Sequence, residues 1–464
     1  MRNLFTLTLS VMAFVTINAQ VMFEKTYGGV GSDVATAAQQ TADGGYIIAG
    51  NSNSFGTGVY VVKTDVNGNE EWSNTYTNMP GTMQPGITQL TDGNFIAIGD
   101  DDNGACIITK INSTGDTIWT DVDSNVAYVG GNFRMAVTAT SDGGFATTSF
   151  DWDISPMTFI SKFNVDGINE WTKEYAPAGS EMSVGNSISE TSDGGFIVVS
   201  VSSQGGSGDA YCIRTDANGD TLWTRLFDSG SDDIGWCGKE TSDGGFVIVG
   251  GKTRVNATGY DFWLIRTDVN GDTLWTRTYG GDDPDEAWYV EVSDDGGFLI
   301  SGETQSFGEG MSDVYLVKTN SVGDTLWTKT FGGIQDECGR YCAQASDGGY
   351  VIAGLTKSIG SGDNDFYLLK TDESGEVSVN TLNNTAQNIE IYPNPMNSKT
   401  TVYFNNPNNT EYQLNIYDIT GKIVKTVNNI TDESVIIYKN QLNSGIYIIE
   451  LKGNITYRNR LIVK

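Results

Sequence analysis

The chain contains no histidine among its 464 residues. This absence excludes Ser-His-Asp triads, histidine metal sites and imidazole general bases. Cysteine is rare as well, and its five copies form no Cys-x-x-Cys pair, which argues against zinc and thioredoxin-like sites. Cys338 and Cys342 are expected on one strand, roughly 13 Å apart and too far for a disulfide. We interpret the cysteines as small buried residues, so catalysis would rest on carboxylates, tyrosine, lysine or hydroxyl groups.

Basic residues and proline are also scarce. The 27 Lys and Arg face 58 Asp and Glu, which gives a net charge of −31. Such a surface repels phosphate, so we expect no nucleic-acid partner. Eight prolines against 57 glycines indicate a chain rich in tight turns. Helical periodicity is absent from the central region, which predicts an all-β protein, expected to be a monomer.

The first 19 residues have the pattern of a secretory signal peptide. Arg2 supplies the positive start, Leu4 to Ile17 is mostly apolar, and Ala19 followed by Gln20 is an acceptable cleavage site. The apolar stretch is too short for a membrane span, and no other segment reaches that length. We therefore expect an exported protein without a transmembrane segment.

A unit of about 50 residues repeats from residue 20 to residue 375. Its Asp-Gly-Gly motif, or a variant of it, begins at Asp43, Asp92, Asp142, Asp193, Asp243, Asp295 and Asp347. A tryptophan marker runs in parallel at Trp72, Trp119, Trp171, Trp223, Trp275 and Trp327. Seven copies at this period predict a seven-bladed β-propeller with one blade per repeat.

Each repeat contains four predicted strands, illustrated by 236–241, 246–250, 262–266 and 273–278. The polar first strand suits the innermost position beside a wet central channel, and the apolar second strand suits the middle of a blade. The Asp-Gly-Gly glycines are expected to supply the positive φ angles of a tight hairpin. The longer and more variable loops gather on the opposite face, where we expect binding.

The two ends of the repeat region are complementary. The seventh repeat lacks the tryptophan-bearing fourth strand, and residues 23–29 match residues 327–333 almost position for position. We expect this N-terminal strand to complete the last blade and close the ring, which removes a free sheet edge. The alternative is that residues 377–381 fill that place.

A polar linker is predicted at 376–387, and a second β domain at 388–464. Seven short strands in so few residues favour a small Ig-like β-sandwich. They are predicted at 389–392, 401–404, 412–417, 422–424, 434–437, 445–451 and 460–464.

Two family resemblances follow from these motifs. With Asp-Gly-Gly-aromatic and Gly-Asp-Thr-Leu-Trp as marks, the repeats resemble the SBBP-type β-propeller repeats of bacterial exported proteins, which implies a fold and no activity. The C-terminal residues resemble the type A sorting domain of the type IX secretion system of Bacteroidetes. That resemblance implies recognition by the outer-membrane translocon, followed by surface attachment or release. The matching residues include Pro393, Asn394, Pro395, Asp418, Gly421, Gly445, Tyr447 and Lys464.

The Asp-x-Asn-Gly-Asp loops at 216–220 and 268–272 resemble the opening of a calcium loop. The closing glutamate of an EF-hand and its flanking helices are absent, and the equivalent copies at 112–116 and 164–168 drift in sequence. A turn tolerates that drift better than a cation does. We interpret the loops as hairpin turns, predict no cofactor, and keep calcium as the alternative.

Departures from the repeat are the most informative positions. Trp152, Asp153, Trp236 and Trp288 are candidate binding residues, because exposed tryptophan beside aspartate suits sugar stacking or a protein hot spot. Buried packing is the alternative for each of them. Glu190, Glu240 and Glu291, with Lys239, Arg134 and Arg340, belong to the innermost strands. They could form a carboxylate pair for glycoside cleavage, although a polar channel lining is the simpler interpretation.

These observations favour an exported, non-enzymatic propeller that binds protein or glycan through its variable face. A carboxylate-dependent polysaccharide hydrolase or lyase is the first alternative, and a structural or spacer protein of the cell surface is the second.

Overall fold

A computed structural model of the chain describes residues 21–79, 84–101, 103–123, 134–150, 157–204, 207–254, 259–377, 390–404, 406, 410–418, 422–439, 442–452 and 456–464. Every regular element in these ranges is a β-strand, so they hold no helix of the length and hydrophobicity that a membrane crossing requires. The chain divides into two compact units, Met1–Ser378 and Val379–Lys464, which are described separately. The expected signal segment, its Ala19–Gln20 cleavage site and residues 378–387 of the expected linker lie outside the described residues.

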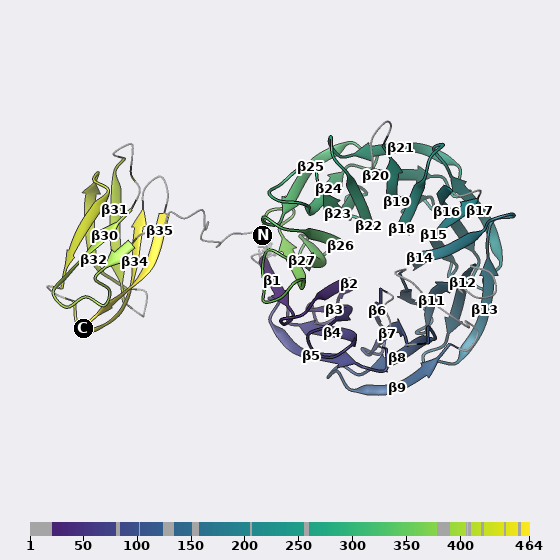
Figure 1. Cartoon of the computed structure of the whole chain (residues 1–464), viewed down its shortest axis with the longest axis horizontal. Helices are drawn as coiled ribbons and strands as arrows, with labels where there is room; N and C mark the ends of the chain where they lie inside the picture. The colour runs from purple at the N-terminus through teal and green to yellow at the C-terminus, as the bar shows by residue number, and fades with distance from the viewer. Residues whose placement is uncertain are drawn as a thin grey trace, which may run out of the picture. The chain divides into compact units, whose positions relative to one another are not determined.

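The first unit is a ring of seven four-stranded antiparallel sheets, counted over the described residues (Figure 1). We number the sheets one to seven by the chain order of their innermost strands, which are the strands nearest the centre of the ring in Figure 1. Within a sheet, consecutive strands are neighbours, as expected for hairpin-connected repeats.

From the inner strand outward, the first sheet consists of β2 (Asp33–Gln40), β3 (Tyr46–Ser52), β4 (Gly58–Thr64) and β5 (Glu70–Tyr76), and the second of β6 (Gly86–Gln89), β7 (Phe95–Asp100), β8 (Cys106–Ile111) and β9 (Thr117–Val122). In the same order, the third sheet consists of β10 (Ala136–Ala139), β11 (Phe145–Phe150), β12 (Thr158–Phe163) and β13 (Asn169–Tyr175). The fourth consists of β14 (Met182–Glu190), β15 (Phe196–Gln204), β16 (Ser207–Thr215) and β17 (Thr221–Phe227).

The fifth sheet consists of β18 (Asp233–Glu240), β19 (Phe246–Thr253), β20 (Tyr260–Thr267) and β21 (Thr273–Tyr279). The sixth consists of β22 (Asp285–Val292), β23 (Phe298–Thr304), β24 (Asp313–Thr319) and β25 (Thr325–Phe331). The seventh consists of β26 (Glu337–Gln344), β27 (Tyr350–Thr356), β28 (Asp365–Thr371) and β1 (Phe23–Tyr27).

The core of the ring lies between neighbouring sheets. The second and third strands are buried almost throughout, as in β24, where every residue is buried. Their side chains meet those of the next sheet, so that Ile47 and Val61 of the first sheet pack in one cluster with Phe95 and Ala97 of the second. The fourth strands are largely exposed. This distribution explains why the second strands are apolar on both faces.

The ring closes through the N-terminal strand, as the sequence predicts. β1 pairs antiparallel with β28, from Phe23 opposite Lys370 to Tyr27 opposite Phe366. Phe23 packs against the hairpin glycine Gly68 of the first sheet, and the Tyr27 hydroxyl donates to the Gly68 carbonyl (2.7 Å). Trp327 packs in the same way against Gly375. The first strand of the chain therefore takes the place of the fourth, tryptophan-bearing strand that the seventh repeat lacks.

The two glycines of Asp-Gly-Gly are required for different physical reasons. Gly44 has φ +85°, which supports the predicted hairpin, and its amide donates to the Thr41 carbonyl (2.8 Å). Gly45 does not have a positive φ; instead, an added Cβ would lie 2.0 Å from the Thr64 carbonyl oxygen. The second glycine is thus required by close approach, a reason that differs from the one predicted.

The aspartate of the same motif anchors a buried cation, which the sequence analysis missed. Lys318 is almost fully buried, and its Nζ lies 2.8 Å from Asp295 Oδ2. The same pairing of a third-strand lysine or arginine with the turn aspartate occurs in all seven sheets: Lys63–Asp43, Lys110–Asp92, Lys162–Asp142, Arg214–Asp193, Arg266–Asp243, Lys318–Asp295 and Lys370–Asp347.

The second unit consists of two antiparallel sheets, β29-β30-β33 and β32-β31-β34-β35. Its strands are β29 (Glu390–Tyr392), β30 (Lys399–Tyr403), β31 (Tyr412–Tyr417), β32 (Ile423–Ile430), β33 (Ser434–Tyr438), β34 (Gly445–Lys452) and β35 (Thr456–Val463). Seven strands match the prediction, and Val402, Leu414 and Leu461 belong to one apolar core.

Candidate functional site

A repeated β-bulge marks the wall of the channel at the centre of the ring. In five inner strands the pairing with the second strand shifts register at the same place. A bulge leaves one residue without a partner opposite it and re-aims its side chain. The five bulge residues are Thr36, Asn186, Trp236, Trp288 and Arg340.

Three of these residues touch one another across the fifth, sixth and seventh sheets. The rings of Trp236 and Trp288 lie 4.3 Å apart at an interplanar angle of 34°, and the Arg340 guanidinium lies 4.5 Å from the centre of the Trp288 ring. We call Trp236, Trp288 and Arg340 the bulge cluster. Trp288 is buried, with 8% of its surface exposed, and Trp236 is half-buried.

Two glutamates lie beside the bulge cluster. Glu286 of β22 and Glu303 of β23 are directly opposite in the strand register, which places their Cβ atoms about 4.5–5.5 Å apart. The Trp236 indole N–H donates to Glu286 Oε1 (3.1 Å). Burial and the neighbouring Glu303 raise the pKa of Glu286 to about 7, and burial raises the pKa of Glu303. Glu286 can therefore hold or release a proton near neutral pH.

The bulge cluster also presents buried donors that lack an acceptor. Arg340 Nε and Nη1 and the Trp288 indole nitrogen have no hydrogen-bond partner among the described residues. A buried donor without an acceptor costs about 1–3 kcal/mol relative to one that is paired. A ligand with acceptor oxygens would recover that free energy.

Arg134 connects inner strands of different sheets. It precedes the third sheet, and its Nη2 donates to the Thr36 carbonyl of the first sheet (2.7 Å) and to the Arg340 carbonyl of the seventh (3.2 Å). Beside it lies a cavity of about 80 Å³, lined in part by Cys237, Tyr289 and Tyr341. The inner strands thus leave a small cavity at this level.

A lysine of the inner wall lies close enough to a glutamate of the next sheet to interact with its charge. Lys239 Nζ lies 5.3 Å from the centre of the Tyr289 ring. Burial lowers the pKa of Lys239, but Glu291 and other nearby groups outweigh that effect, and the net pKa is raised. Lys239 is accordingly a cation in this site.

Glu190 and Glu240, the other two carboxylates predicted in the channel, bind serine residues of neighbouring turns. Glu190 accepts hydrogen bonds from the amide (2.8 Å) and hydroxyl (3.0 Å) of Ser141, in the turn of the preceding sheet. Glu240 binds Ser192 in the same way, at 2.6 and 3.0 Å. Both residues link neighbouring sheets at the Asp-Gly-Gly face and contribute no carboxylate pair to the bulge cluster.

The Asp-x-Asn-Gly-Asp loops bind their own backbone. Asp268 Oδ1 accepts the amides of Asn270 (2.8 Å) and Asp272 (2.9 Å), and these bonds lower the pKa of Asp268. Asp272 pairs with Arg225 of the preceding sheet (2.9 Å). The geometry is that of a hairpin turn whose carboxylates already have partners.

The remaining predicted residues separate into two groups. Trp152, Asp153 and Gly421 lie outside the described residues. In the second unit, Asn394 accepts the Ile462 amide (2.8 Å) and donates to the Arg460 carbonyl (2.7 Å), which fixes the turn that Pro393 and Pro395 flank to the last strand.

The other motif residues of the second unit close its turns or lie at its surface. Asp418 Oδ1 accepts the Lys422 amide (3.1 Å), and the buried Tyr447 donates its hydroxyl to the Asn443 carbonyl (2.9 Å). Gly445 and Lys464 are exposed. The motif is thus a set of turn-closing contacts in the β fold.

Sequence reasoning named Trp236 and Trp288 but missed their contact with Arg340 and the opposed Glu286 and Glu303. A small residue precedes the bulge position in each of the five repeats that carry a bulge, as in Gly235-Trp236 and Gly339-Arg340. That pattern could have aligned the five bulge residues, although it does not predict the bulge itself.

Comparison with known proteins gives a family for the C-terminal residues and distant likenesses to other proteins. Residues 390–464 match the family described as the secretion system C-terminal sorting domain. The regulatory protein FlaEY of Caulobacter vibrioides is 26% identical over 155 residues, 28% of this chain and 16% of that protein. The endo-acting ulvan lyase of Formosa agariphila is 27% identical over 154 residues, 31% of this chain and 28% of the lyase. The chain thus spans less than a third of the length of these curated relatives.

Among solved structures, the BP39L lectin from Burkholderia pseudomallei is similar with a TM-score of 0.53 at 8% identity, covering 75% of this chain and 97% of the lectin. At that identity the likeness shows the fold alone. The first unit therefore has a β-propeller fold, and residues 390–464 belong to the secretion system C-terminal sorting domains, which implies type IX secretion to the cell surface or the medium.

Proposed function

We propose that this chain is an exported, non-enzymatic glycan-binding protein whose seven sheets are the blades of a seven-bladed β-propeller of SBBP type. An Ig-like sandwich at its C-terminus would deliver it to the surface or the medium of a Bacteroidetes cell, after removal of a signal peptide at Ala19–Gln20. The bulge cluster would be the centre of the binding site.

The unsatisfied donors of the bulge cluster are the observation that carries this proposal. Arg340 Nε and Nη1 and the Trp288 indole nitrogen would donate to hydroxyl or ring oxygens of a saccharide. The half-buried Trp236 ring would offer an apolar face to the sugar. A protein ligand is the alternative within the same binding function.

A glycan array with the purified full chain tests the proposal. Arg340→Ala and Trp236→Ala should each abolish binding of the glycans that the natural chain retains. Arg277→Ala is a matched control, because Arg277 lies 5.2 Å over Trp275 on an outer strand, far from the inner wall in the strand order. Binding that survives Arg340→Ala, or is lost equally with Arg277→Ala, would reject the bulge cluster as the site.

Polysaccharide cleavage is the second candidate, and the opposed Glu286 and Glu303 favour it. A carboxyl group with a pKa of about 7 suits proton transfer at neutral pH. The distant likeness to an endo-acting ulvan lyase is compatible with this second candidate. Turnover of any polysaccharide that Glu286→Gln removes, without loss of glycan binding, would replace the non-enzymatic proposal with this one.

A further inference from the structure

Among the described residues, four junctions between neighbouring sheets hold a pair of acidic side chains, on the face opposite the Asp-Gly-Gly turns. One member lies at the start of a third strand and the other begins the first strand of the next sheet. The pairs are Asp209 with Asp233, Asp261 with Asp285, Asp313 with Glu337, and Asp365 with Asp33.

One junction departs from the other three. The residue that follows the outer strand is Gly28, Gly280 or Gly332 in three of them, and an added Cβ there would lie 2.1–3.0 Å from carboxylate oxygens of both members of the pair. In the junction of the fourth and fifth sheets this residue is Asp228. The chain thus adds a third carboxylate at the position where the other junctions have none.

The extra charge has no counter-charge in the described part of the chain. Asp261 is compensated by Arg254 Nε at 3.3 Å, and Asp365 accepts the Ser361 amide at 2.7 Å. Asp209, Asp228 and Asp233 form no ion pair with a described lysine or arginine. Three neighbouring carboxylates without a cation repel one another, and burial strengthens that repulsion.

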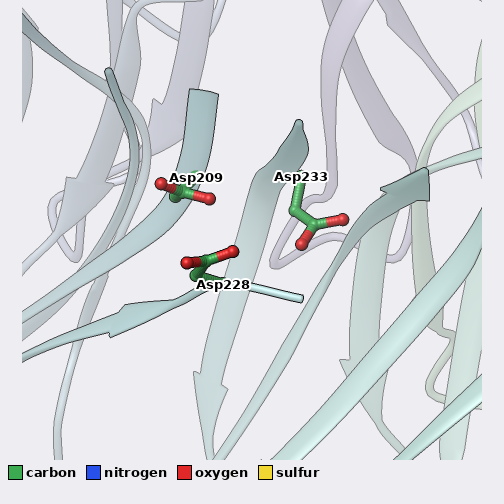
Figure 2. Close-up of side chains that lie close together, drawn as sticks. All are labelled: Asp209, Asp228 and Asp233. Carbon is green, nitrogen blue, oxygen red and sulfur yellow. The ribbon is translucent and has the colours of Figure 1, made fainter. Parts of the chain in front are cut away.

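The three side chains gather at one point from three chain segments (Figure 2). One oxygen of each lies within 4.8 Å of the others. Asp233 is fully buried and fixed by the amides of Ser229 (2.7 Å) and Thr253 (3.1 Å). Asp209 is 6% exposed, and its Oδ1 has no hydrogen-bond partner among the described residues.

We propose that Asp209, Asp228 and Asp233 form a calcium site at the junction of the fourth and fifth sheets. Ca²⁺ takes oxygen ligands at about 2.3–2.6 Å, so two ligands of one ion lie up to about 5 Å apart, which agrees with the observed oxygen spacing. Asp228 is exposed, so water can complete the coordination from the solvent side. Mg²⁺ demands a tighter octahedron and should bind more weakly.

Calorimetric titration of the chelator-treated full chain with CaCl₂ tests the proposal. One Ca²⁺ per chain should bind with a Kd of about 10⁻⁴–10⁻³ M, the range of extracellular modules, and MgCl₂ should bind more weakly. Asp228→Gly should weaken calcium binding about 10- to 100-fold and still fold, because glycine is the residue of the other three junctions. Asp363→Asn, an exposed aspartate in another loop, controls for the loss of one negative charge and should leave the titration unchanged.

Thermal unfolding of Asp209→Asn separates a ligand from a merely structural residue. Without calcium the variant should melt at a higher temperature than the natural chain, because a buried repulsive charge is gone. With calcium the natural chain should gain melting temperature and the variant should not. Absence of calcium binding by the natural chain, or an equal calcium-induced gain in Asp209→Asn, would overturn the proposal.

Discussion

The closure of the ring by β1 can be tested by a double-mutant cycle on Phe23 and Gly68. Phe23 is 8% exposed and packs in the apolar cluster that joins the seventh and first sheets. Phe23→Ala removes a buried aromatic ring, which costs about 3–5 kcal/mol of unfolding free energy. Gly68 has φ +71°, and an added Cβ would lie 2.7 Å from the Phe23 ring.

Gly68→Ala therefore combines two costs. The left-handed backbone costs an L-residue about 1–2 kcal/mol, and the overlap with the ring adds about 1–3 kcal/mol. Gly93→Ala isolates the first cost, because Gly93 has φ +84° and nothing within 4 Å of the added Cβ. In a Phe23→Ala background the overlap disappears, so the two substitutions should be less than additive by about 1–3 kcal/mol.

Urea unfolding monitored by tryptophan fluorescence measures these differences. All ten tryptophans precede residue 378, so the signal reports the propeller unit and not the sorting domain. Equal costs for Gly68→Ala and Gly93→Ala, together with additivity in the double mutant, would show that Phe23 does not pack on Gly68. The pairing of β1 in the last sheet would then be wrong.

Three other predictions follow from charges and from the sorting domain. The pKa of Glu286 is raised to about 7 in the folded chain, so ionisation of this residue at higher pH opposes folding. Glu286→Gln should therefore raise the free energy of unfolding, measured with urea, by about 1–2 kcal/mol at pH 8.5 and have little effect at pH 5. A pH-independent effect would contradict this. The pKa of Asp142, about 2, is lowered by hydrogen bonds to Lys162 and Thr140 that outweigh burial. Its stabilisation is present above the unfolded pKa and lost as the pH falls to 2, so Asp142→Asn should be destabilising at pH 6 and nearly neutral at pH 2, as urea midpoints would show. Deletion of residues 388–464 should leave the propeller unit in the periplasm, which cell fractionation measures; normal secretion would refute that role.

Much of the fold could be predicted from the sequence, because each repeat encodes its own turns. Asp-Gly-Gly and Asp-x-Asn-Gly-Asp specify hairpins through contacts within a few residues, and the period of about 50 residues follows directly from their spacing. The match between residues 23–29 and 327–333 even predicted the strand that closes the ring. The sorting motif was recognisable from its residues, although Asn394 holds its turn through contacts with the distant last strand.

The candidate site could be predicted only in part, because its contacts join different repeats. Arg340 reaches Trp288 only because two inner strands carry bulges at the same level, and a bulge depends on pairing between strands rather than on local sequence. Arg134 contacts Thr36 and Arg340 from the far side of the channel, at separations that no repeat period encodes.

By itself, the sequence determined the repeat, the turns, the acidic surface and the C-terminal sorting motif, all of which depend on neighbouring residues. Only the tertiary structure determined which acidic side chains lie close together. Asp209 and Asp233 belong to different sheets, and Asp228 lies in the connection that joins those two sheets. The physical reason is that repulsion between carboxylates, and the lack of an acceptor for a buried donor, depend on distances between residues of different sheets. The closed ring sets those distances.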